Sequence, residues 1–152
     1  MRTLPFVAAA GAALLAGCAS TPEPAPPMGQ WGLQSSATAG TALAFTQQGQ
    51  DVLRIACLRS PAGLYVASDR LPPSAGAARL QIGERVFTLT ASATAEPRFS
   101  ATAPSPPALT AALMSGEPVR LMAGSRSLAP LPAPDGKLAA AFSIACRATA
   151  DG

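Results

Sequence analysis

The chain has 152 residues, of which 49% are hydrophobic and 12% charged, and its formal net charge is +3. It contains no histidine, which excludes Ser-His-Asp and Cys-His catalytic sites and zinc or copper sites with histidine ligands. The length suits one domain of ordinary size, with a core large enough to fold alone. The side chains left for chemistry or binding are the cysteines, serines, carboxylates and basic residues.

The amino terminus has the pattern of a secretory signal peptide. Arg2 supplies a positive charge, and an apolar run follows from Leu4 to Ala16. At 13 residues this run is shorter than the ~20 residues that a membrane-spanning helix needs. A signal peptide over residues 1–17 is therefore favoured over a transmembrane helix.

The apolar run ends in Leu15-Ala16-Gly17-Cys18, which resembles the lipobox of bacterial lipoprotein precursors. The resemblance implies cleavage before Cys18, a thioether-linked diacylglycerol on that cysteine, and a further acyl chain such as palmitate on its amine. Two or three acyl chains hold a protein stably on a membrane. Ala19 and Ser20 stand where inner-membrane lipoproteins carry aspartate, so we expect a lipid-anchored outer-membrane protein facing the periplasm. An ordinary signal peptide is the alternative.

The segment after the lipobox, residues 18–30, is rich in proline and is expected to be an extended tether. At about 3.1 Å per residue, its portion Ser20–Gln30 would lift the domain roughly 30 Å from the bilayer. A proline-rich ligand for an aromatic groove is the alternative. Removal of Arg2 with the leader lowers the formal charge from +3 to +2. Without a cluster of basic residues, nucleic acid is not an expected partner.

Residues 31–148 are expected to form a single β-rich domain, followed by a short tail at 149–152. Apolar and polar residues alternate there as in strands with one buried face. Gly83-Glu84 is a turn signal between two such runs and predicts a hairpin. The expected strands are centred on Leu43 and Phe45, on Leu53, Ile55 and Cys57, on Leu64 and Val66, on Leu80 and Ile82, on Phe87 and Leu89, on Phe99, and on Val119 and Leu121.

Two segments depart from this alternation. Residues 105–116 have a serine placed to cap a helix, prolines in the first turn and a glycine at the end, which predicts a short helix. Residues 136–147 are ambiguous. Leu138 and Phe142 are four positions apart, as on one face of a helix, but they also share strand parity with Ile144. The alanine content favours the helix.

The other two cysteines, Cys57 and Cys146, fall at apolar-face positions. In an exported, oxidising compartment such a pair predicts a disulfide. The bridge would close a loop of about 90 residues and contribute on the order of 4 kcal/mol. A redox pair usually has C-x-x-C spacing, which is absent, and two buried thiols are the remaining alternative.

The layout of the domain also resembles small periplasmic domains of alphaproteobacteria that are uncharacterised or loosely grouped as invasion-associated. The resemblance covers residues 31–148 and implies a fold but no functional residues. We expect a mainly β domain, an antiparallel sheet or small sandwich with one or two short helices, with α+β as the alternative. The resemblance rests on Leu53-x-x-x-Cys57, Leu64-Tyr65-Val66, Leu109-x-x-Ala112-Leu113-x-x-Gly116, Pro118-Val119-Arg120-Leu121 and Phe142-x-x-x-Cys146.

No catalytic constellation, cofactor motif or metal motif is found, so we expect no catalytic residues, cofactor or metal. Ser125 lacks the second glycine of a nucleophile elbow, and Lys137 has Pro134 rather than serine three positions before it. Asp51 and Asp69 would form a glycosidase dyad or an oxygen-ligand metal site if they converged at a sheet end. Solvated turn carboxylates are the favoured interpretation.

Four residues share outward parity on the expected strands: Arg54, Tyr65, Arg79 and Arg120. If their strands are neighbours, these side chains line one open sheet face that suits acidic protein loops or lipid phosphate. The alternative is an ordinary solvated face.

These observations favour a non-enzymatic envelope lipoprotein with a structural or protein-interaction role, held on the membrane through Cys18 and in contact with an envelope protein. A periplasmic enzyme inhibitor or an accessory factor in secretion or virulence is the second reading, because such proteins share this small, anchored, disulfide-closed format. A carboxylate-dependent hydrolase is the third.

Overall fold

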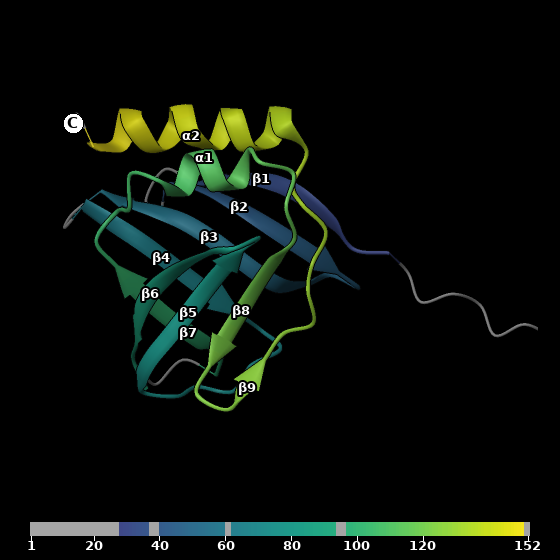
Figure 1. The fold of residues 1–152 in the computed structure, drawn as a ribbon, viewed down its shortest axis with the longest axis vertical. Coiled ribbons are helices and arrows are strands. Elements are labelled where there is room, and N and C mark those ends of the chain that lie inside the picture. The colour runs from purple at the N-terminus through teal and green to yellow at the C-terminus, as the bar shows by residue number, and fades with distance from the viewer. Residues whose placement is uncertain (1–27, 37–39, 60–61, 94–96, 151–152) are drawn as a thin grey trace, which may run out of the picture.

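The computed structural model describes residues 28–36, 40–59, 62–93 and 97–150. Within them nine strands form one antiparallel sheet, accompanied by two helices (Figure 1), which confirms the mainly β prediction. The elements are β1 (Gln30–Ser36), β2 (Gly40–Gln47), β3 (Gln50–Arg59), β4 (Ala62–Ser68), β5 (Gly76–Ile82), β6 (Arg85–Ala91), β7 (Phe99–Ala103), α1 (Leu109–Leu113), β8 (Val119–Ala123), β9 (Arg126–Ser127) and α2 (Gly136–Ala150).

The strand order is β1-β2-β3-β4-β7-β6-β5-β8-β9, and the sheet is open. β7 pairs with β4 over five residues but with β6 through only Thr90↔Thr102 and Ala91↔Ala101. The predicted hairpin is confirmed as β5 and β6, and Gly83 in its turn has φ +57°. A positive φ is the conformation that glycine adopts without steric cost.

One face of the sheet carries the core. Large apolar side chains from strands at both ends of the order belong to a single buried cluster, so the sheet curves around its own apolar face. The largest fully buried members are Phe99, Phe142, Leu43, Leu53, Ile55, Leu64, Leu80, Ile82, Leu89, Leu113, Leu121 and Val66. The alternation that predicted the strands therefore arises because the largest apolar side chains lie on one face of the sheet.

The two helices lie together at one end of this apolar face (Figure 1). α2 packs against α1 and against β1, β2 and β3. Phe142 is buried in the core, whereas Ile144 is 63% exposed. A strand would have placed both side chains on one face, so helical packing decides the ambiguity in this segment.

α1 is shorter than the predicted helix, and its cap is different. It begins at Leu109 after Ala108, with no side-chain hydrogen bond at the cap, so the expected capping role of Ser105 is wrong. The prolines explain the later start. The carbonyl of Pro106 accepts a hydrogen bond from the N–H of Leu109, 3.0 Å away, which forms a turn before the helix.

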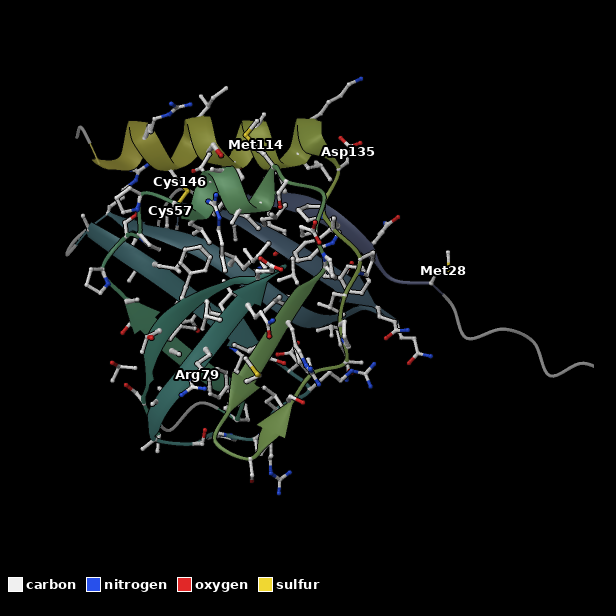
Figure 2. The ribbon with its side chains drawn as sticks, viewed as in Figure 1. Met28, Cys57, Arg79, Met114, Asp135 and Cys146 are labelled. Carbon is white, nitrogen blue, oxygen red and sulfur yellow. A yellow bond between two sulfur atoms is a disulfide. The ribbon has the colours of Figure 1, made fainter. Side chains whose placement is uncertain are left out.

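A disulfide fastens α2 to the sheet. Cys57 of β3 and Cys146 of α2 are bonded, with their Cα atoms 5.5 Å apart, and Figure 2 shows the pair between the helix and the strands. Cys57 is buried on the same face as Leu53 and Ile55. The predicted pairing is confirmed, and it connects positions 89 residues apart.

Replacing both Cys57 and Cys146 with alanine should lower the free energy of unfolding by about 4 kcal/mol, because the unfolded chain would regain the freedom of a long closed loop. Urea denaturation under non-reducing conditions measures the change. Reductant should bring the native protein close to the variant and leave the variant unaffected. An unchanged unfolding midpoint in the variant would contradict a stabilising bridge.

Candidate functional site

The four outward residues of the sheet share one face but do not form one patch. Arg54 and Tyr65 stand on the adjacent strands β3 and β4, and Arg79 and Arg120 stand on the adjacent strands β5 and β8. β7 and β6 separate the two pairs. The condition for one shared patch, that the strands of all four residues are neighbours, is therefore not met.

Arg54 is occupied by intramolecular contacts. Its Nε donates to Oδ2 of Asp51 at 2.9 Å, and its Nη2 donates to Oε1 of Gln34. Gln34 in turn donates from Nε2 to Oδ1 of Asp51 at 3.4 Å. These side chains tie β1 to β3 across the outer face of β2, where Ala42 and Ala44 are buried. Arg54 thus serves the sheet rather than an external ligand.

Arg120 is also engaged, and Arg79 is not. Nε of Arg120 donates to the carbonyl of Leu128 at 3.3 Å, and its Nη2 lies 3.4 Å from the hydroxyl of Ser127. Arg79 is exposed, beside a small surface hollow of about 260 Å³ that Met122 also lines. Within the described ranges, Arg79 is the one arginine of the predicted set whose guanidinium has no hydrogen bond or ion pair.

Asp51 and Asp69 do meet at a sheet end, where hydrogen bonds from their backbone N–H groups join the two residues. The N–H of Asp51 donates to Oδ2 of Asp69 at 2.9 Å, and the N–H of Asp69 donates to the carbonyl of Asp51 at 2.9 Å. The Asp51 carboxylate is paired with Arg54. Among the residues that the structure describes, no group of three His, Cys, Asp or Glu side chains is placed to hold a metal ion. Both carboxylates thus make structural contacts, and Asp51, whose side chain is 17% exposed, lies within β3 rather than in a solvated turn.

The hydroxyls of the buried serines Ser68 and Ser143 are also engaged. The hydroxyl of Ser68 donates to the carbonyl of Val52 at 2.7 Å, and that of Ser143 donates to the carbonyl of Ala139 at 2.8 Å. Ser125 is exposed in the turn between β8 and β9. A nucleophilic serine needs a neighbouring base, and these contacts supply backbone carbonyls instead.

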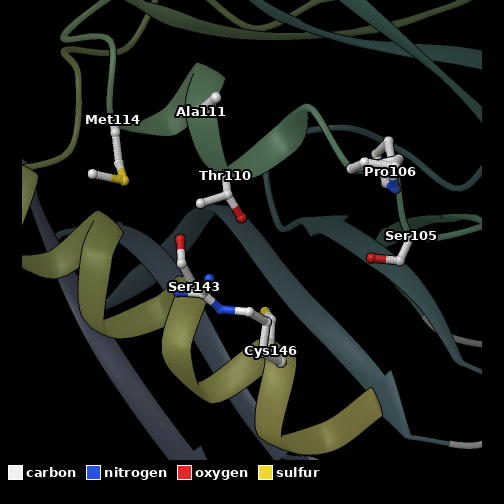
Figure 3. Close-up of a pocket in the computed structure, with 9 residues that line it drawn as sticks. Ser105, Pro106, Thr110, Ala111, Met114, Ser143 and Cys146 are labelled. Carbon is white, nitrogen blue, oxygen red and sulfur yellow. The ribbon is translucent and has the colours of Figure 1, made fainter. Parts of the chain in front are cut away.

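An open groove of about 700 Å³ lies between α1 and α2 (Figure 3). Its apolar wall includes Pro106, Ala111 and Met114, and the side chain of Met114 is 52% exposed. Cys146 and Arg147 of α2 also line it. The disulfide therefore lies at the edge of the groove and holds the helix that forms one wall.

No sequence motif indicates this groove, because its walls come from two separate segments, residues 105–114 and 143–147, that lie against each other only in the folded domain. The available signals were indirect. Pro106 and Pro107 shorten α1. Met114 follows the last residue of that helix, and its large apolar side chain is exposed rather than buried in the core. Both features become informative only once α2 is known to be a helix.

Comparison with known proteins adds no family. No protein-family model matches the chain, and neither a curated protein nor a solved structure matches it. The search for membrane spans over the described residues found no helix both long enough and apolar enough to cross a bilayer. The predicted signal peptide, the lipidation residue Cys18 and most of the tether lie outside the described residues.

Arg54→Ala should lower the free energy of unfolding by about 1 kcal/mol, because it leaves Asp51 and Gln34 without their shared partner. Arg79→Ala is the matched control and should stay within about 0.5 kcal/mol of the native protein. Chemical denaturation of the two variants measures the difference. Equal losses in both variants would contradict the structural role assigned to Arg54.

Proposed function

We propose that the protein is a lipid-anchored, non-enzymatic component of the bacterial envelope. In this proposal Cys18 carries the acyl chains, the proline-rich tether links it to the folded domain, and the domain faces the periplasm from the outer membrane. Its role is structural or lies in binding another envelope protein, without a cofactor, a metal or nucleic acid.

The observation that carries this proposal is that two of the three cysteines are bonded to each other, while the third stands in the lipobox-like sequence. Cys57 and Cys146 are bonded to each other, so neither is available as a disulfide partner for Cys18. Structural disulfides persist in exported proteins and are rare in the reducing cytosol. The remaining cysteine is the one in the lipobox-like sequence Leu15-Ala16-Gly17-Cys18. A bridged domain and a separate cysteine behind an apolar leader together support export followed by lipidation.

The contacts of the polar side chains favour binding over chemistry. The carboxylate of Asp51 is paired with an arginine, that of Asp69 accepts a backbone hydrogen bond, and the hydroxyls of Ser68 and Ser143 donate to carbonyls. The open groove between α1 and α2, lined by the half-exposed side chain of Met114, instead offers a surface that a partner protein can cover. This distribution supports an interaction role.

Cys18→Ser tests the anchor. The native protein should fractionate with membranes and show an intact mass raised by its acyl chains, whereas Cys18→Ser should lose that added mass and leave the membrane fraction. Two or three acyl chains provide stable retention, and their loss removes it.

The double variant Cys57→Ser/Cys146→Ser is the matched control, because it also removes cysteines but leaves the lipobox intact. It should keep both the lipid mass and the membrane fractionation. Membrane retention of Cys18→Ser at the native level would overturn the proposal.

A further inference from the structure

The two edges of the sheet differ in whether another segment of the chain covers them. Beyond β8, the chain turns back and covers the strand. The N–H of Leu128 donates to the carbonyl of Leu121 at 2.9 Å, and Leu131 and Val119 exchange backbone hydrogen bonds of 2.8 and 3.0 Å. At the opposite edge, β1 pairs with β2 and, within the described residues, with no other strand.

The open edge lacks the features that usually prevent strand association. Natural edge strands carry charges, proline or bulges, or are covered by another segment. β1 has the sequence Gln-Trp-Gly-Leu-Gln-Ser-Ser, without a charge or a proline, and its pairing with β2 is continuous over seven residues. At its centre Leu33 is 36% exposed. The strand is therefore a ready template for a further antiparallel strand.

We propose that β1 pairs with β1 of a second copy of this chain, antiparallel about a twofold axis at Leu33. Directly opposed residues of an antiparallel pair point to the same face, so a symmetric pair must be centred on a residue rather than between two. Only the centre at Leu33 pairs all seven residues of Gln30–Ser36. The proposed pairing uses only the outer edge of β1 in the folded domain, so it does not rest on the proposed lipid anchor at Cys18.

The side chains of this register are complementary. Leu33 meets the partner's Leu33 on the face that carries the core, and the apolar contact covers its exposed side chain. On the outer face Gln34 stands opposite the partner's Gly32. A Cβ at Gly32 would have no heavy atom within 4 Å, so space for the glutamine is present. Because the strand is uncharged, the two copies bring no like charges together, and the interface is isologous.

Charge substitutions at Leu33 test the twofold directly, because the axis places each copy's residue 33 opposite itself at about 5 Å. Two full-length chains with different carboxy-terminal tags are produced in the same cells, extracted, and isolated through one tag. Two native chains should co-isolate. Two Leu33→Lys chains should co-isolate at least tenfold less, and a Leu33→Lys chain with a Leu33→Glu chain should recover most of the signal.

Val86→Lys is the matched control. Val86 is an exposed apolar strand residue of β6, which lies inside the sheet and has neighbours on both sides. A pair of Val86→Lys chains should co-isolate as native chains do. Shared detergent micelles cannot explain the pattern, since every chain keeps the same amino terminus.

Disulfide cross-linking tests the register. In this alignment two Leu33→Cys residues lie opposite each other, whereas two Ser35→Cys residues are separated by four positions, or roughly 13 Å. Leu33→Cys should give a dimer on non-reducing gels and Ser35→Cys should not. The proposal is overturned if native chains do not co-isolate, if two Leu33→Lys chains associate as well as native ones, if opposite charges do not restore association, or if Ser35→Cys cross-links as strongly as Leu33→Cys.

Discussion

The apolar face at the β1 end of the sheet has to be covered, and this requirement determines where α2 lies. A sheet that curves around its own apolar face but does not close leaves part of that face for other elements to shield. Here α2 packs over β1, β2 and β3 and places Phe142 in the core, and the Cys57–Cys146 bond holds it there. The groove between the helices and the position of Arg147 follow from that attachment.

A second contact draws the two ends of the strand order together. The indole Nε1 of Trp31, in β1, donates to the carbonyl of Pro132 at 2.7 Å, just beyond β9. The Trp31 ring also meets Phe45 edge to face, with ring centroids 5.3 Å apart. The side chain thus joins the segment that protects one edge to the strand that forms the other, without adding a strand pair. The outer backbone N–H and C=O groups of β1 pair with no other strand of the described residues, so they can pair with β1 of a second copy.

The parts of the fold that could be predicted are those in which local alternation reports burial directly. β2 to β6 and β8 carry large apolar side chains at every second position, so their faces and the hairpin turn follow from the sequence. β1 was missed because Gly32 and the polar residues after Leu33 give it too few apolar positions, and its strand state depends on pairing with β2. The start of α1 was misjudged because a capping serine outweighed the two prolines that delay the helix.

The candidate site was harder to predict. Alternation along a strand indicates which face of the sheet a side chain lies on, but it does not indicate which strands are adjacent. Arg54 and Arg79 do point outward from the same side of the sheet, yet β4, β7 and β6 lie between their strands. The partners of Arg54 come from β1 and from the start of β3, and no spacing rule indicates the first of these. In contrast, the Cys57–Cys146 pair was predictable, because three cysteines with one in a lipobox leave a single pairing.

We propose that the three cysteines have two separate roles: Cys57 and Cys146 close the domain, and Cys18 carries the membrane anchor. Non-reducing peptide mapping by mass spectrometry of protein purified from membranes tests it most directly. We expect a peptide linked through Cys57 and Cys146, together with an amino-terminal peptide that begins at Cys18 and carries acyl chains. A disulfide that includes Cys18, a free thiol at Cys57 or Cys146, or an unmodified amino-terminal peptide would contradict it.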